Sequence, residues 1–118
     1  MAYTDIYHLF DNEQVEFSVK IYFPGHFEAL RKIYCGAQKD FIEAFCTTQR
    51  WKDVSGGKSR STFFQTQCQK YVIKIVKGSE IKMFEEMSQS YFEYLKESFS
   101  RQCPTTIAKT LGIFKIKI

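Results

Sequence analysis

The stretch from Ser55 to Phe64, "SGGKSRSTFF", holds the side chains of this sequence that are best suited to bind phosphate. Two glycines, a lysine and an arginine lie among several hydroxyl side chains within ten residues. Glycine allows the backbone to approach an anion closely, and the two cations favour negative charge beside it. The stretch is therefore a candidate phosphate-binding loop, and two known kinds of loop can be compared with it.

One kind is the P-loop, which has the pattern G-x-x-x-x-G-K-[ST], follows a strand and begins a helix. Gly57, Lys58 and Ser59 match the end of this pattern, but Lys52 stands where its first glycine is required. The residues "STFFQTQ" that follow the glycines are typical of a strand rather than a helix. These two differences exclude a P-loop.

The other kind is a glycine-rich turn between two strands, with its backbone over nucleotide phosphates and a lysine on the following strand to neutralise them. Lys74 lies in the apolar run "YVIKIV" at a suitable distance from the glycines. Because an unpaired buried lysine is costly, either its side chain is solvated or its ammonium has an anionic partner. Val72 and Val76 share its face at period two, so Val72 would contact an adenine ring while Lys74 reaches the α- and β-phosphates. The alternative is a lysine exposed on an edge strand.

Hydrophobic spacing predicts the elements that position these residues. Segments that alternate apolar and polar side chains are strands, and segments with apolar residues three or four apart are helices. In chain order, we predict a strand at 15–23, helices at 26–34 and 39–45, a loop at 50–61, a hairpin from 62–67 and 70–76, a helix at 79–95 and a strand at 111–118. Pro24 and Gly25 end the first strand, Gly36 separates the first two helices, and Ser79 is the expected N-cap of the third.

Each predicted helix carries one apolar face, which we assign to the core. The faces consist of Phe27, Leu30, Ile33 and Tyr34 in the first helix, Phe41, Ile42 and Phe45 in the second, and Ile81, Phe84, Met87, Tyr91 and Leu95 in the third. Such faces cover a sheet in a small layered domain. The expected fold class is α+β, an antiparallel sheet with helices largely on one face, in a single domain over residues 1–118.

The composition is that of one globular domain with a weak preference for anionic partners. The chain has 118 residues, a net charge of +4 and 17% aromatic residues. We find no leader peptide and no run long enough to span a membrane, so we expect a cytoplasmic protein. Cys35, Cys46, Cys68 and Cys103 lack the spacing of a zinc site, and we expect free thiols.

Seven segments resemble the N-terminal lobe of the phosphatidylinositol phosphate kinases, most closely the branch that phosphorylates phosphatidylinositol 3-phosphate at the 5-position. They are "HLFDNEQVEFSVKIYFPGHFEALRK", "DFIEAF", "WKDVSGGKSRSTFFQT", "YVIKIV", "SEIKMF", "YFEYL" and "LGIFKI", and they extend over most of the chain. The resemblance implies binding of ATP with Mg²⁺ between two lobes. It also implies transfer of the γ-phosphoryl group to an inositol hydroxyl at a membrane surface.

The resemblance further implies roles for individual residues. Lys74 matches the family's nucleotide-binding lysine, and Val72 would be a second ATP contact. Glu80 matches an acidic residue at the start of the long helix and is a candidate partner for Lys74; the alternative is a carboxylate that only favours the helix dipole. The positions that match the phosphate-covering loop are Gly56, Gly57, Lys58 and Ser59.

This loop departs from the family at one position. Its usual form is Gly-Lys-Ser-Gly-Ser, and Arg60 stands where the second glycine is expected. An arginine takes positive φ at a cost that glycine does not have, so close approach of the backbone to phosphate is disfavoured. The guanidinium offers an anion contact of its own instead.

In this family the catalytic and Mg²⁺-binding carboxylates lie in a C-terminal lobe beyond the last strand of the N-terminal lobe. We find no such motif here, so we expect this chain to be a partial kinase domain with no catalytic residue, no metal site and no activity alone. We also expect the isolated lobe to bind ATP weakly. The expected partners in a complete kinase are ATP and the phosphoinositide surface of an endosomal-type membrane, to which the protein would be peripheral.

Two other functions agree with the sequence. The chain can be a non-catalytic module that binds a protein, or a second copy of itself, through an exposed nucleotide face. It can instead be a general anion binder, although no nucleic-acid signature is present and we expect no nucleic-acid partner. The basic residues of such a patch would be Lys58, Arg60, Lys70, Lys74, Lys115 and Lys117.

Overall fold

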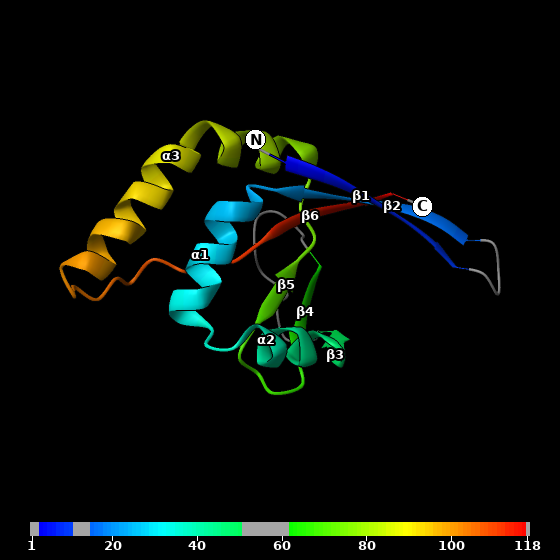
Figure 1. The fold of residues 1–118 in the computed structure, drawn as a ribbon, viewed down its shortest axis with the longest axis horizontal. Coiled ribbons are helices and arrows are strands. Elements are labelled where there is room, and N and C mark those ends of the chain that lie inside the picture. Colours follow the sequence, from blue (N-terminus) through cyan, green and yellow to red (C-terminus); the bar gives the residue numbers. More distant parts are fainter. Residues whose placement is uncertain (1–2, 11–14, 51–61, 118) are drawn as a thin grey trace. The chain divides into compact units, whose positions relative to one another are not determined.

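A computed structural model describes residues 3–10, 15–50 and 62–117 of the chain, and these residues form two compact units (Figure 1). One unit comprises Met1–Gly36 and Ile107–Ile118, and the other comprises Ala37–Thr106. The loop residues Gly56, Gly57, Lys58, Ser59 and Arg60, predicted to cover phosphate, lie outside the described residues. Each unit is described by itself below.

The first unit contains a three-stranded antiparallel sheet in the order β1-β2-β6. Its strands are β1 (Tyr3–Phe10), β2 (Val15–Tyr22) and β6 (Ile113–Lys117), so the two ends of the chain flank β2. The Cα partners of Val19 are Ile6 in β1 and Ile116 in β6. The strands predicted at 15–23 and 111–118 are confirmed, whereas β1 was not predicted.

Helix α1 (Pro24–Tyr34) follows β2 directly in the first unit. Phe23 precedes it with φ 47°, a left-handed conformation that an aromatic residue rarely adopts, and Pro24 fixes the first helical turn. Phe27 and Leu30 are buried as predicted, but Ile33 and Tyr34 are each 37% exposed. Only two of the four residues expected in the core are therefore buried, because the last turn of α1 is exposed to solvent.

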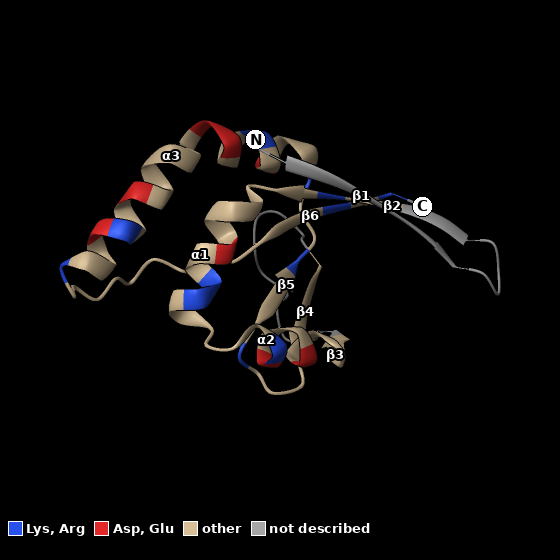
Figure 2. Ribbon diagram, in the orientation of Figure 1, with Lys and Arg blue, Asp and Glu red and all other residues tan. Residues whose placement is uncertain are grey.

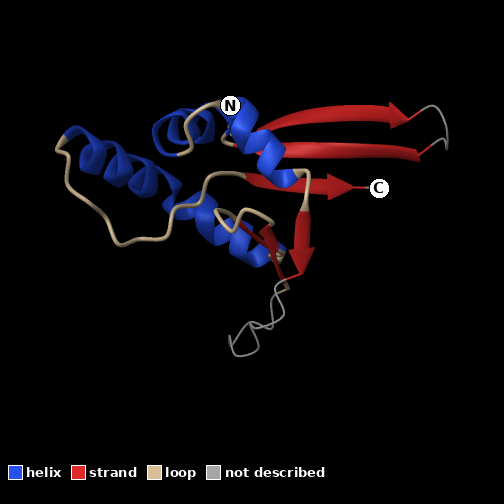
Figure 3. Ribbon diagram, turned by 90° about the horizontal axis from the view of Figure 1, so that it is seen from below, coloured by secondary structure: helices blue, strands red, loops and turns tan. Residues whose placement is uncertain are grey.

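The second unit contains another three-stranded antiparallel sheet, in the order β3-β4-β5. Figure 3 draws the strands in red and the helices in blue. Its strands are β3 (Thr48–Arg50), β4 (Phe63–Thr66) and β5 (Val72–Lys74). The β4–β5 hairpin confirms the prediction from residues 62–67 and 70–76. The α+β class with antiparallel pairing is confirmed, and the described strands are divided between two sheets.

Helix α2 (Gln38–Phe45) packs its aromatic residues on the turn of this hairpin. The ring of Tyr71 lies 5.2 Å from that of Phe41 and 5.4 Å from that of Phe45, between ring centroids. Ile42, which we assigned to the same face, is 54% exposed and so is not a core residue. Gly36 separates α1 from α2 with φ 71°, a conformation that favours glycine.

Helix α3 (Gly78–Ser100) is longer than predicted and begins one residue earlier. Lys77, with an extended backbone and no side-chain cap, is its N-cap, so the assignment of Ser79 as N-cap is wrong. Tyr91 and Leu95 are buried, together with Ser88, whereas Met87 is 50% exposed. Ser88 can be buried in place of Met87 because its hydroxyl donates to the Glu85 carbonyl at 2.8 Å.

Helices within the described ranges are too short or too polar to cross a membrane. The structure records Cys35, Cys46, Cys68 and Cys103 as free thiols. Basic and acidic residues are interspersed along the described part of α3, as Figure 2 shows.

Candidate functional site

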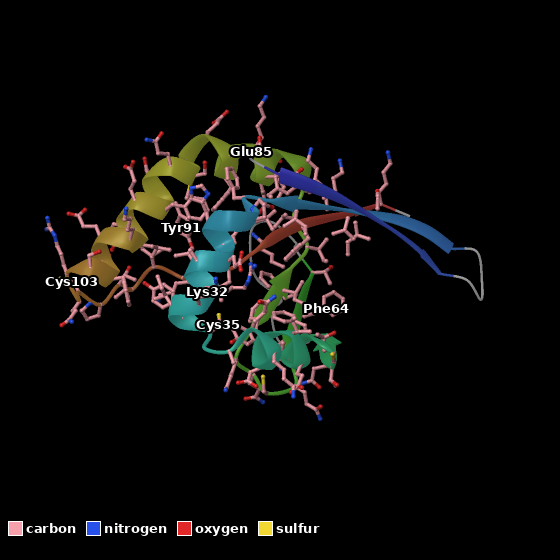
Figure 4. All side chains as sticks on the ribbon, in the orientation of Figure 1. Lys32, Cys35, Phe64, Glu85, Tyr91 and Cys103 are labelled. Atoms are coloured by element: carbon pink, nitrogen blue, oxygen red, sulfur yellow. The ribbon has the colours of Figure 1, made fainter. Side chains whose placement is uncertain are left out.

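The β4–β5 hairpin sets the position of Lys74. Phe63 is the direct Cα partner of Lys74, and the next pair along the hairpin is Phe64 with Ile73. Because side chains alternate between the two faces of a strand, Phe63 and Lys74 share one face and Phe64 and Ile73 share the other. Figure 4 labels Phe64 on β4. The hairpin therefore places an aromatic ring beside the stem of the lysine.

The turn of the hairpin is held by a buried threonine. Thr66 is 0% exposed, and its Oγ1 accepts a hydrogen bond from the Tyr71 backbone N–H at 3.2 Å. The Thr66 backbone N–H donates in turn to the Tyr71 carbonyl at 3.0 Å. Gln69, at φ 61°, supplies the left-handed residue that the turn requires. These bonds fix the register that brings Phe63 opposite Lys74.

Glu80 is the anionic partner of Lys74. The Lys74 Nζ lies 3.0 Å from Glu80 Oε2, with side-chain exposures of 39% and 34%. Glu80 is in the first turn of α3, where a carboxylate also interacts favourably with the helix dipole. The two explanations offered by the sequence for Glu80 thus apply together. Because both side chains are more than a third exposed, the pair contributes at most about 1 kcal/mol to stability.

The Lys74 ammonium also lies over an aromatic ring. Its Nζ is 6.0 Å from the centroid of the Phe63 ring, which is within the range of a cation–π contact. The ammonium is thus held by Glu80 from the following helix and by Phe63 from the preceding strand. Sequence reasoning missed Phe63, although a hairpin centred on Cys68 and Gln69 would have placed it opposite Lys74.

The surface beside Lys74 is apolar and open to solvent. Val72, on the same face of β5, is 50% exposed, and Val76, just beyond the strand, is 38% exposed. Ile75, whose backbone N–H donates to the Thr62 carbonyl at 3.0 Å, is 56% exposed. A cation beside exposed apolar side chains matches the two halves of a nucleotide, its phosphates and its base. The described hairpin thus presents a cation and exposed apolar side chains side by side.

A binding site for Mg²⁺ is not found in the described residues. They contain no group of three or more His, Cys, Asp or Glu side chains that could hold a metal ion. Glu80, the acidic residue beside the site, is already paired with Lys74. Among the residues that the structure describes, we therefore assign no metal ligand.

The turn also carries a thiol with an altered acidity. Cys68 Sγ lies 3.3 Å from Thr66 Oγ1, and this hydrogen bond, followed by one involving the Lys70 backbone, lowers the pKa of Cys68 below its usual value. A hydrogen bond lowers a thiol pKa when it favours the thiolate over the thiol. Cys68 is exposed, so its sulfur is accessible to reagents.

Comparison with known proteins identifies similar sequences over the whole site. Residues 45–118 match the family model described as Phosphatidylinositol-4-phosphate 5-Kinase. The chain is 41% identical over 105 residues to the putative 1-phosphatidylinositol-3-phosphate 5-kinase FAB1C of Arabidopsis thaliana, a match that covers 89% of this chain and 6% of that protein.

Two further relatives show the same pattern of coverage. The 1-phosphatidylinositol 3-phosphate 5-kinase FAB1 of Saccharomyces cerevisiae is 35% identical over 115 residues, which are 98% of this chain and 5% of that protein. Phosphatidylinositol 4-phosphate 5-kinase 3 of Arabidopsis thaliana is 34% identical over 103 residues, which are 86% of this chain and 14% of that protein. The chain thus spans a small part of the length of each relative.

Proposed function

Because this chain belongs to the phosphatidylinositol-4-phosphate 5-kinase family, we propose that it forms the ATP-facing part of a lipid kinase. The kinase would transfer the γ-phosphoryl group of ATP to a phosphatidylinositol phosphate. Relatives named as phosphatidylinositol 3-phosphate 5-kinases support phosphatidylinositol 3-phosphate as the lipid and the 5-hydroxyl as the acceptor. Such a kinase would work at the surface of an endosomal-type membrane.

The observation that carries the proposal is the ion pair between Lys74 and Glu80. In phosphoryl transfer, a lysine on a strand neutralises the nucleotide phosphates, and an acidic residue on the next helix holds that lysine in place. The described hairpin and the start of α3 supply both groups at 3.0 Å.

Each described residue then has a defined task. Lys74 donates hydrogen bonds to the α- and β-phosphate oxygens, and Glu80 orients its ammonium before the nucleotide arrives. Val72 offers its exposed side chain to the adenine ring.

The loop residues are proposed to bind the phosphates as well. Gly56, Gly57, Lys58 and Ser59 would cover the phosphates, with Arg60 as an additional anion contact. ATP supplies the phosphoryl group, and we place no catalytic residue in this chain, so it would be inactive alone.

A chimeric enzyme tests the proposal. Residues 1–118 replace the matching segment of the Saccharomyces cerevisiae relative, and phosphorylation of phosphatidylinositol 3-phosphate in vesicles is measured with radiolabelled ATP. As a control, the same host receives the matching segment of the Arabidopsis thaliana FAB1C relative. We expect activity from both chimeras, and loss of activity on Lys74→Met in ours. An inactive chimera beside an active control, or a fully active Lys74→Met variant, would overturn the proposal.

A non-catalytic binding role is the alternative, and the exposed apolar side chains of Val72, Ile75 and Val76 favour it. It predicts that the chain self-associates or binds a protein through the hairpin whether or not Lys74 is present. Sedimentation of the 118-residue chain and of its Val72→Ser variant distinguishes the two: concentration-dependent association that Val72→Ser abolishes would support the alternative.

A further inference from the structure

Phe63 makes a contact with Lys74 that the proposed nucleotide role does not by itself require. The two residues are direct cross-strand partners in the β4–β5 hairpin. The Lys74 Nζ lies over the Phe63 ring at 6.0 Å from its centroid, while the same nitrogen lies 3.0 Å from Glu80 Oε2. The ring and the carboxylate therefore hold the ammonium jointly.

We infer that Phe63 is a positioning residue for Lys74, and that it keeps the ammonium beside Glu80 and directed toward the nucleotide face. The inference rests on the proposed function for its consequence in catalysis, but the contact itself does not depend on that function. A lysine side chain has four rotatable bonds and loses considerable entropy when it is held in one geometry. The Glu80 pair is too exposed to hold it tightly alone.

The aromatic ring of Phe63 restricts the Lys74 side chain in two ways. Its face attracts the cation, and its bulk, directly opposite on the neighbouring strand, excludes extended rotamers that would carry the ammonium away from Glu80. A leucine at this position would keep much of the bulk but would lose the attraction to the cation. A tyrosine would keep both, so the two substitutions separate the effect of the ring from that of general packing.

The first test detects the contact by NMR in the 118-residue chain. We expect nuclear Overhauser contacts between the ε-protons of Lys74 and the Phe63 ring, and an upfield ring-current displacement of the Lys74 ε-resonances. Phe63→Leu should abolish the displacement and Phe63→Tyr should retain it. Phe64→Leu is the matched control, since Phe64 is opposite Ile73 on the other face, and it should leave Lys74 unchanged.

Two results would overturn the inference in this first test. One is the absence of the Overhauser contact in the unmodified chain. This result would show that Lys74 and Phe63 are not in contact, even when a leucine variant does not fold. The other is a Lys74 ε-resonance that is the same in the unmodified and Phe63→Leu chains.

The second test measures the consequence in the chimeric kinase. Phe63→Leu should raise KM for ATP about 2- to 5-fold, with a smaller effect on kcat, and Phe63→Tyr should restore it. Phe64→Leu, on the other face of the hairpin, should leave KM for ATP unchanged. An equal rise in KM in the Phe63→Leu and Phe64→Leu chimeras would contradict a positioning role. An inactive chimera beside an active control would refute the proposed function, and the NMR result would still decide the contact.

Discussion

The Lys74 ammonium and the Glu80 carboxylate are 3.0 Å apart, and this pair joins the end of β5 to the first turn of α3. Backbone hydrogen bonds on both sides fix the segments that carry these two side chains. The Ile75 N–H donates to the Thr62 carbonyl at 3.0 Å, which continues the hairpin one residue beyond Lys74. The Glu80 N–H donates to the Lys77 carbonyl at 3.0 Å, which starts the helix. Local structure therefore brings the backbones of Lys74 and Glu80 together before any ligand binds.

Glu80→Gln should affect function much more than stability. The exposed ion pair contributes at most about 1 kcal/mol, so the denaturant midpoint of the chain should move little. In the chimeric kinase, however, a lysine without its carboxylate is poorly oriented, and we expect kcat/KM to fall about 10- to 100-fold. Radiolabelled lipid phosphorylation and urea unfolding followed by circular dichroism measure the two effects.

The matched control is Glu86→Gln, which removes the same charge from an exposed position on α3. It should leave kcat/KM within about 2-fold, because no lysine of the site depends on it. Equal losses of kcat/KM in the two variants would mean that the negative charge of α3, rather than the ion pair with Lys74, determines kcat/KM.

Cys68 should be alkylated at a lower pH than an ordinary exposed cysteine. The hydrogen bond with Thr66, the largest cause, favours the thiolate and lowers the pKa of Cys68, so the reactive fraction at neutral pH is larger. The pH dependence of iodoacetamide labelling, followed by mass spectrometry in a Cys35→Ser, Cys46→Ser, Cys103→Ser background, gives the midpoint.

Substitutions at Thr66 test the cause of this shift. Thr66→Val removes the hydroxyl and should move the labelling midpoint to higher pH, whereas Thr66→Ser should keep it low. If the valine variant titrates like the unmodified chain, the hydrogen bond at 3.3 Å does not control the thiol.

The central part of the site could be predicted because its signals are local. Two β-rich runs separated by a polar turn predicted the β4–β5 hairpin, and a lysine within an apolar strand required a partner or solvent. Glu80 was identified as a candidate partner through the family resemblance. Phe63 was not identified, because its role depends on the register of the hairpin rather than on spacing along one strand.

The features that were missed have weak signals in the sequence of their own segment. Strand β1 alternates weakly, and it is defined by eight residue pairs with β2. Met87 has helical spacing with Tyr91, but Ser88 is nearer to the centre of the buried face of α3, so Met87 is half exposed. Periodicity alone gives the width of an apolar face poorly, because it does not show which part of the helix is covered.

Arg31→Met should destabilise the first unit by about 1–3 kcal/mol. Its guanidinium donates a hydrogen bond from Nη1 to the Leu111 carbonyl at 2.8 Å and so ties α1 to the segment before β6. A partly buried carbonyl that loses its charged hydrogen-bond donor lowers the free energy of unfolding. Urea unfolding gives the size of the effect, and faster amide exchange in residues 111–117 would locate it.

Lys32→Met is the control for Arg31→Met. Lys32 is also in the last turn of α1, but within the described residues it forms an ion pair with Glu28 at 3.4 Å, and both side chains are largely exposed. Its loss should cost less than about 0.5 kcal/mol. Equal destabilisation by the two variants would show that the bond to Leu111 contributes nothing specific.

Leu95→Ala should be among the most destabilising single substitutions in α3. Leu95 is 0% exposed, and truncation of such a leucine removes buried methyl groups and leaves a cavity, at a cost of about 2–5 kcal/mol. Met83→Ala is the control on the same helix, since Met83 is 67% exposed and its truncation should change the free energy of unfolding by less than about 0.5 kcal/mol. Urea unfolding of the 118-residue chain measures both. A Leu95→Ala chain as stable as the Met83→Ala chain would mean that the side chain of Leu95 is not buried in solution.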